Sequence, residues 1–285
     1  MKLGTTLLLV GCLTAMAETE ERINKSFTAE PGGKLVLDVD FGSVEITTSQ
    51  KPEVTIDVFR KVKRGGKADE EAFLKERPVT IAQDGKTITV QSRATSKNSW
   101  RGSQRTEGKY TLSVPEQFNA QVRTSGGNVS IADLRGEVKA KTSGGSLKFA
   151  NLRGKLEGDT SGGNIKVADC DGPLVLHTSG GEIDINNATA SVDASTSGGN
   201  VSAQFAKAIA DEVTLKTSGG NVTLRVAEKS AFDLDASTSG GSVKSDLPVQ
   251  IEGKPKSTQM KGPVNGGGKP VVLRTSGGNV HVKKI

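Results

Sequence analysis

The sequence predicts an all-β protein, a parallel β-solenoid whose rungs of about 18 residues each hold two strands, with a β-rich cap at the N-terminal end. Three observations predict this fold. The tetrapeptide Thr-Ser-Gly-Gly recurs in register, apolar and polar residues alternate around it, and glycine is abundant where aromatic residues are scarce. We take the coil to be right-handed, because parallel crossover connections are right-handed.

The composition excludes several other classes of protein. The 285 residues include 35 Gly but only eight Phe, one Tyr and one Trp, and apolar residues make up 34% of the chain. Glycine is 35 of 285 residues, about 12%, against roughly 7% in ordinary proteins, and with so few aromatic residues we do not expect a conventional globular core. Disorder is not indicated, because the formal net charge is only +6 and the chain has only nine Pro. Collagen is excluded, because the sequence has no Gly-X-Y period.

The repeat defines the rungs. Thr-Ser-Gly-Gly occurs eight times, at intervals of 18 residues four times, 21 twice and 37 once. The copies start at Thr124, Thr142, Thr160, Thr178, Thr196, Thr217, Thr238 and Thr275. Self-similarity at a fixed period is the signature of stacked repeats. The long last interval contains the insertion Lys244–Gly268, rich in Pro, Gly and Lys, which we expect to close the C-terminal end before the last rung.

Each rung contains two strands and two turns. Apolar residues recur every nine positions, as at Val129, Val138 and Leu147, with polar residues between them, and this alternation is typical of a strand with one buried face. One turn is Thr-Ser-Gly-Gly, and the other resembles Asp133–Gly136. We expect the glycines of both turns to supply a positive φ and the rungs to stack about 4.8 Å apart.

Several polar columns have a structural explanation. We expect the turn threonines to point inward and bond along the stack, and the Asn residues after the second Gly to form a polar ladder. Cys170 falls in a column of leucines, which predicts a small buried hydrophobe. Lys139 and Lys141 are expected to face Glu157 and Asp159 on the next rung and to form weak ion pairs.

The chain divides into a cap, residues 18–118, and a solenoid, residues 119–285. The cap region is rich in strand patterns, with a short helix over residues 69–77, a hairpin at Asp84-Gly85 and a degenerate first turn at Phe41-Gly42. Open sheet edges invite aggregation, so we expect this region to cover the N-terminal end of the stack.

Residues 1–17 have the pattern of a secretory signal peptide. Met1-Lys2 precedes the apolar run Leu3–Ala17, which is too short to span a membrane and ends in a small-x-small cleavage site. The alternative is a lipoprotein signal in which Cys12 carries a lipid anchor. We expect cleavage after Ala17 and export to the periplasm, the cell surface or the medium. No later stretch is apolar enough to span a bilayer.

One segment, Ser92–Lys109, is not explained by packing. It holds the only Trp of the chain and five cationic residues against the single carboxylate of Glu107. A basic loop with an aromatic side chain can hold an anionic polymer or stack on a sugar ring, and a solvated loop is the alternative. The candidate ligand-binding residues are Arg93, Lys97, Trp100, Arg101 and Arg105.

We expect no metal, cofactor or nucleic acid to bind. Asp133, Asn151 and Asp169 lie in successive turns, but a calcium site needs more converging oxygens. His177 and His281 fall on outward columns of different rungs without companion ligands. The small positive net charge does not favour nucleic acid.

These motifs resemble a bacterial family known as "putative adhesin", a domain of unknown function with Thr-Ser-Gly-Gly β-strand repeats. The matching residues are Val114-Pro115, Thr124–Val129 and the later copies, ending in Leu273–Val280. The resemblance covers most of the chain after residue 17. It implies an exported β-solenoid and, by the family's name, adhesion, and it brings no catalytic residues.

The leading hypothesis is a non-enzymatic module of the cell envelope or extracellular space that binds an envelope or extracellular polymer or a surface protein. A polysaccharide-acting β-helix enzyme is less favoured, because no Asp/Glu pair recurs at one place on adjacent rungs. Ice binding by the turn threonines is also less favoured, because they point inward and are flanked by charged residues such as Lys141 and Asp159.

Overall fold

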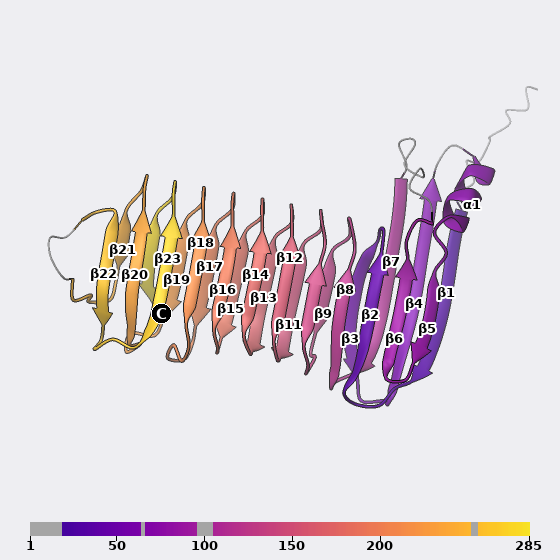
Figure 1. The fold of residues 1–285 in the computed structure, drawn as a ribbon, viewed down its shortest axis with the longest axis horizontal. Coiled ribbons are helices and arrows are strands. Elements are labelled where there is room, and N and C mark those ends of the chain that lie inside the picture. The colour runs from indigo at the N-terminus through magenta and orange to yellow at the C-terminus, as the bar shows by residue number, and fades with distance from the viewer. Residues whose placement is uncertain (1–18, 64–65, 96–104, 252–255) are drawn as a thin grey trace, which may run out of the picture.

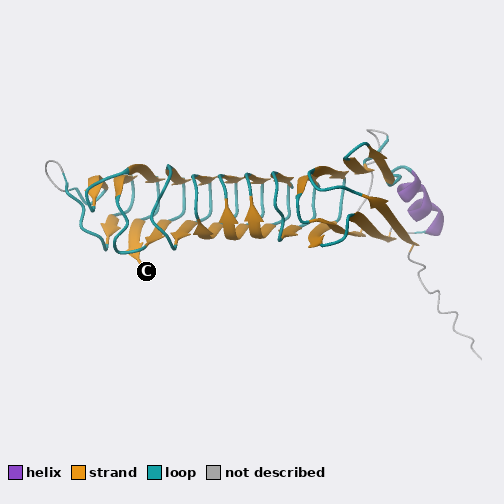
Figure 2. Cartoon of the chain, turned by 90° about the horizontal axis from the view of Figure 1, so that it is seen from below, coloured by secondary structure: helices purple, strands orange, loops and turns teal. Residues whose placement is uncertain are grey.

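The computed structural model of the chain describes residues 19–63, 66–95, 105–251 and 256–285. They form an elongated molecule of two 12-stranded sheets, with the strands perpendicular to the long axis (Figure 1). From below, the sheets are two layers joined by loops on both sides (Figure 2). Eleven strand spacings of about 4.8 Å give a length of about 53 Å. The predicted solenoid with two strands in each rung is confirmed.

The spatial order of the strands differs from their order in the sequence at both ends of the stack. The first sheet consists, from one edge to the other, of β1 (Thr19–Thr28), β4 (Glu53–Lys63), β7 (Arg105–Pro115), β3 (Ser43–Ser49), β9 (Val129–Ala132), β11 (Leu147–Arg153), β13 (Ile165–Asp171), β15 (Ile183–Ala188), β17 (Val201–Phe205), β19 (Val222–Val226), β24 (Val280–Lys284) and β21 (Val243–Ser245). The second consists of β22 (Gln259–Val264), β20 (Phe232–Thr238), β23 (Lys269–Thr275), β18 (Val213–Thr217), β16 (Val192–Thr196), β14 (Leu174–Thr178), β12 (Leu156–Thr160), β10 (Val138–Lys141), β8 (Phe118–Arg123), β2 (Gly33–Val39), β6 (Thr87–Ser92) and β5 (Thr80–Asp84).

The apolar columns of the repeat fill one continuous core between the sheets. The parallel registers follow the 18-residue period, so that Val138 of β10 lies opposite Leu156 of β12. Inward residues are buried and outward residues are half-buried or exposed along the rung strands, which reproduces the predicted alternation. The expected ion pairs between adjacent rungs are also present, with Lys139 3.3 Å from Glu157.

The Thr-Ser-Gly-Gly turns hold neighbouring rungs together by two contacts. Seven of the eight buried Thr hydroxyls donate to the carbonyl of the second Gly of the adjacent rung, as from Thr160 to Gly145 at 2.8 Å. The remaining one, Thr124, donates to the carbonyl of Gly42 in the first turn at 3.1 Å. The second Gly packs against the same oxygen, because a Cβ on Gly163 would lie 1.9 Å from it. The glycines of these turns do not have a positive φ, so that expectation is wrong for this turn. In the other turn it is confirmed, at Gly136 and Gly154.

The N-terminal end interleaves its strands. The rung β2–β3 lies between β6–β7 on its outer side and β8–β9 on its inner side. The predicted turn at Phe41-Gly42 connects β2 to β3. β4 and β1 extend one sheet in antiparallel fashion, and β5 extends the other through the predicted hairpin at Asp84-Gly85. The predicted helix is α1 (Lys67–Lys75), which packs over Val62 through Phe73 and Leu74.

The C-terminal end departs from the expected order. The rung β20–β21 lies at the end of the stack, with β22 antiparallel on its outer side. The last rung in the sequence, β23–β24, lies one place further in, between β18–β19 and β20–β21. The insertion therefore closes one sheet as expected, but the last rung is not the end rung.

Candidate functional site

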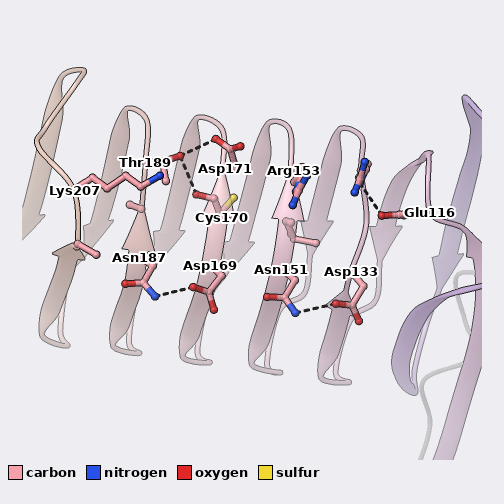
Figure 3. Close-up of a pocket in the computed structure, with 14 residues that line it drawn as sticks. Glu116, Asp133, Asn151, Arg153, Asp169, Cys170, Asp171, Asn187, Thr189 and Lys207 are labelled. Atoms are coloured by element: carbon pink, nitrogen blue, oxygen red, sulfur yellow. Dashed lines mark hydrogen bonds and ion pairs between the residues drawn. The ribbon is translucent and has the colours of Figure 1, made fainter.

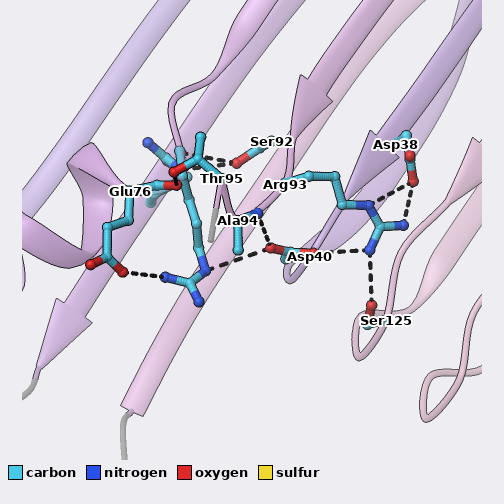
Figure 4. Close-up of polar contacts among 10 residues, drawn as sticks. Asp38, Asp40, Glu76, Ser92, Arg93, Ala94, Thr95 and Ser125 are labelled. Carbon is cyan, nitrogen blue, oxygen red and sulfur yellow. Dashed lines mark hydrogen bonds and ion pairs between the residues drawn. The ribbon is translucent and has the colours of Figure 1, made fainter. Parts of the chain in front are cut away.

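Arg93, the first of the predicted binding residues, is held by carboxylates of its own chain (Figure 4). Its guanidinium donates to Asp38 and Asp40 at 2.9 Å and to the hydroxyl of Ser125 at 3.3 Å. Partial burial acts to lower the pKa of Arg93, but the bonds to Asp38 and Asp40 outweigh it and raise that pKa. The cation is neutralised within the fold, where it ties the end of β6 to β2 and to the first Thr-Ser-Gly-Gly turn.

The structure does not bring the other predicted residues together with Arg93. Lys97, Trp100 and Arg101 lie outside the described residues, as do Cys12 and the predicted signal peptide. Arg105 begins β7, where its backbone lies opposite Lys63 of β4. β6 and β7 themselves pair with β2 and β3 in parallel, as the strands of neighbouring repeat rungs pair with each other.

A groove of about 630 Å³ crosses five rungs on the edge opposite the Thr-Ser-Gly-Gly turns (Figure 3). We call it the edge groove. Its lining residues are Glu116, Asp133, Arg135, Asn151, Leu152, Arg153, Asp169, Cys170, Asp171, Asn187, Ala188, Thr189, Ala206 and Lys207. They lie at the ends of β11, β13 and β15 and in the turns that lead from the first sheet back to the second, so equivalent positions repeat with the rung spacing of about 4.8 Å.

One wall of the edge groove is a ladder of alternating Asp and Asn. Its four members, Asp133, Asn151, Asp169 and Asn187, have φ between 52° and 61°, a left-handed conformation that Asp and Asn adopt more readily than most residues. The amide of Asn151 donates to Asp133 at 2.9 Å, and that of Asn187 donates to Asp169 at 2.7 Å. The second carboxylate oxygens and the amide oxygens remain available as acceptors.

The other wall carries the cations. Arg135 pairs with Glu116 at 2.7 Å and closes the end nearer the cap. Among the described residues, Arg153 and Lys207 form no ion pair, and they stand three rungs, or about 14 Å, apart. Between them, the hydroxyl of Thr189 donates to Asp171 at 2.9 Å (Figure 3).

The floor of the edge groove is apolar. It consists of Leu152, Cys170 and Ala188, whose exposed fractions are at most 2%. Burial, with a smaller effect of Asp171, raises the pKa of Cys170 to about 12, so the thiol is protonated at neutral pH and is not a nucleophile. Cys170 is the small buried hydrophobe that the sequence predicts.

A thiol reagent at pH 8 is expected to leave Cys170 unmodified in the folded protein and to modify it after unfolding in urea. Burial excludes the reagent and holds the thiol protonated, whereas an unperturbed cysteine, with a pKa of about 8.5, is partly ionised at that pH. Mass spectrometry of the peptide that contains Cys170 measures the labelling. Equal rates with and without urea would contradict a sealed floor.

The described residues include no group of three or more His, Cys, Asp and Glu side chains placed to hold a metal ion. Asp133 and Asn151 bond to each other rather than converge on a common point. His177 lies 2.7 Å from the hydroxyl of Ser195, and His281 lies 3.1 Å from Asp246. In the same part of the chain, no helix is long and apolar enough to cross a membrane.

The edge groove is not among the predicted binding sites. Its signal in the sequence is the recurrence of Asp or Asn three residues before Gly, as in Asp133–Gly136, Asn151–Gly154 and Asp169–Gly172. That pattern is typical of turns, and the positive φ values confirm the turns. The same residues also place acceptors and cations along one edge, because every turn lies directly above its neighbour.

No curated protein matches the chain. Similar solved structures include a "putative adhesin" from Bacteroides fragilis, 14% identical with a TM-score of 0.48, and another from Parabacteroides distasonis, 11% identical with a TM-score of 0.43. Each match covers 93% of this chain and 97% of the other. A "putative lipid binding protein" from Parabacteroides distasonis is 12% identical, with a TM-score of 0.33 over 93% of this chain and 96% of the other.

A family model describes the chain more directly. The model of the Toastrack family, DUF4097, matches residues 33–283. The match begins at β2, in the predicted cap, and ends in β24, so it takes in every rung of the stack. The chain therefore belongs to the Toastrack family, a domain of unknown function.

Proposed function

We propose that the chain is an exported, non-enzymatic, adhesin-like module of the cell envelope or extracellular space, and that its edge groove holds a linear glycan. The observation that carries this proposal is the repetition of Asp and Asn acceptors in steps of one rung, across the groove from the cations Arg153 and Lys207. A polymer with a regular repeat can meet a matching group at successive steps. A small molecule would use one step and leave the rest of the groove open.

The groups on the two walls indicate the chemistry of the ligand. The free oxygens of Asp133, Asn151, Asp169 and Asn187 accept hydrogen bonds, so they suit a ligand with many hydroxyl groups. The cationic side chains across the groove suit occasional carboxylate or phosphate groups on the same chain. A glycan with acidic substituents combines both.

The carboxylates of the edge groove support binding rather than catalysis. Each is engaged by a neighbour, namely Asp133 by Asn151, Asp169 by Asn187, Asp171 by Thr189 and Glu116 by Arg135. Glycoside hydrolysis requires one carboxyl group that gives up a proton and a second that is free to attack or to activate water. The signal-like residues 1–17 support export.

Replacing Arg153 with Ala is expected to weaken binding to an acidic envelope polysaccharide by roughly 10- to 100-fold, because a hydrogen bond to a charged group contributes about 1.5–3 kcal/mol. Lys207→Ala is expected to act similarly from the other end of the groove. Co-sedimentation with purified peptidoglycan, lipopolysaccharide and capsular polysaccharide measures the binding. Lys148→Ala is the matched control, because Lys148 lies on the same rung as Arg153 but on the outer face of β11.

Two results would contradict the proposal. If the protein binds none of these polymers, the proposed function is wrong. If it binds one of them equally well with both substitutions, the edge groove is not the binding site. In the second case Trp100→Ala with Arg101→Ala tests the basic loop, which stays a sequence prediction. Release of reducing ends from the bound polymer would favour the enzyme alternative. Ice binding is not favoured, because the turn threonines are buried.

A further inference from the structure

The C-terminal region contains a rung that is inserted between two others. After β19 the chain passes over one rung position and forms β20–β21, which leaves a slot between β18–β19 and β20–β21. The last segment, β23–β24, then fills this slot from Lys269 to Lys284. We call β23–β24 the inserted rung.

The inserted rung is bonded on both sides like any other rung. The hydroxyl of Thr275 donates to the carbonyl of Gly220 at 2.7 Å, and that of Thr238 donates to Gly278 at 2.7 Å. The Asn ladder also runs through it unbroken, since the backbone N–H of Asn279 donates to the side chain of Asn221 at 2.8 Å. One further contact, from Arg274 to Asp235 at 2.6 Å, fixes it to β20.

The contacts in the slot are the same whether the inserted rung comes from the same chain or from a second copy. Thr275–Val280 repeats the sequence Thr-Ser-Gly-Gly-Asn-Val that is found at Thr217–Val222. The inserted rung is held by backbone bonds, by the Thr and Asn ladders common to the repeat rungs and by the Arg274–Asp235 ion pair, and a second copy of the chain supplies all of these groups. An identical rung from another copy would therefore make the same contacts, which is the condition for exchange of an element between protomers.

The connection that keeps the rung in its own chain is short and constrained. Residues 265–268 link β22, on the outer side of β20, to β23, on its inner side, and so must cross the start of β20. Asn265, Gly266 and Gly267 have φ of 48°, 92° and 81°. The amide of Asn265 donates to the carbonyls of Glu228 and Ser230, both at 2.9 Å, which pins this hinge to the segment that passes over the slot.

We propose that the inserted rung is exchangeable and that two copies of this chain pair by each placing β23–β24 in the slot of the other. The closed and exchanged forms then share every rung contact. They differ only at residues 265–268, which turn back in the closed form and extend to the partner in the exchanged form. A constrained hinge of this kind shifts the balance toward exchange when its turn is disfavoured.

The test places a disulfide between the inserted rung and its neighbour. Thr214 of β18 and Val272 of β23 face each other in register and are half-buried, so Thr214→Cys with Val272→Cys reports which chain fills the slot. The full chain, with Cys12→Ser, is refolded from urea when dilute and when concentrated, as a mixture of two tag lengths, and then oxidised. We expect disulfides within one chain in the dilute sample and mixed-tag dimers joined by disulfides in the concentrated one.

The hinge variant Gly267→Val is expected to raise the dimer fraction at least about fivefold, because a β-branched residue disfavours the positive φ of the closed turn. Phe149→Leu, a core change far from the hinge, is the control for general destabilisation. Disulfides within single chains at every concentration would overturn the proposal. Dimers without disulfides between chains would also overturn it, because they would form through another surface. If Gly267→Val does not fold, the refolding of the two-cysteine chain decides alone.

Discussion

Gly163→Ala is expected to lower the free energy of unfolding by about 3–4 kcal/mol. The new Cβ would lie 1.9 Å from the carbonyl oxygen of Gly145, and the other nearby atoms are also backbone, so no side chain can move aside. The two rungs would have to separate at this edge. Separation also stretches the bond from Thr160 to the same carbonyl. Urea denaturation followed by circular dichroism measures the effect.

The neighbouring glycine provides a matched control. A Cβ on Gly162 would have no atom nearer than 3.8 Å, and its φ is not positive. Gly162→Ala should therefore leave stability unchanged or raise it by up to about 1 kcal/mol, because alanine restricts the unfolded chain. Equal losses at Gly162 and Gly163 would show that the turn conformation, rather than the approach of the rungs, requires glycine.

Arg60→Ala is expected to lower the free energy of unfolding by about 3–5 kcal/mol, because it removes a fully buried cation together with three hydrogen bonds, one of them to the half-buried carboxylate of Glu21. The side chain of Arg60 is fully buried in the cap. Its guanidinium donates to Glu21 at 2.6 Å, to the carbonyl of Arg77 at 2.5 Å and to the hydroxyl of Ser92 at 3.0 Å. It thereby joins β1 and β4 of one sheet to β6 of the other. Urea denaturation again measures the loss.

The control for Arg60 is an exposed ion pair. Lys51 lies 3.6 Å from Glu53 with most of its side chain in solvent, so Lys51→Ala should change the free energy of unfolding by less than about 0.5 kcal/mol. Arg60→Met with Glu21→Gln should recover part of the loss, because it removes both charges and keeps apolar volume. If Arg60→Ala lowers the free energy of unfolding no more than Lys51→Ala does, the contacts of Arg60 between the two sheets do not stabilise the fold.

The rungs were predictable because their residues repeat. Two columns nine residues apart specify two strands in each rung, and a fixed period specifies stacking, so local patterns and global fold agree. The role of the turn glycines was not predictable in the same way. Glycine is required either by a positive φ or by a close approach of two backbones. The sequence is the same in both cases, and only the structure of the stacked turns shows that the close approach is the cause here.

Other features depend on where distant segments lie. The 37-residue interval shows that something is inserted, but the inserted rung carries the same repeat as all others, so its place in the stack leaves no trace in the sequence. Arg60 follows Val54, Ile56 and Val58 at alternate positions of β4, and that pattern marks it as an inward residue. Its partners come from three other segments, which the pattern cannot show.

The position of β23–β24 also determines how the molecule would carry a mechanical load. A stack that ends in its last rung can be peeled from the tip, with one edge breaking at a time. A pull on β24 instead enters one rung inside, where the strands are bonded on both edges in both sheets. A pull along β24 then acts in shear on its two interfaces, with β19 and with β21, and β20–β22 lie outside the loaded rung.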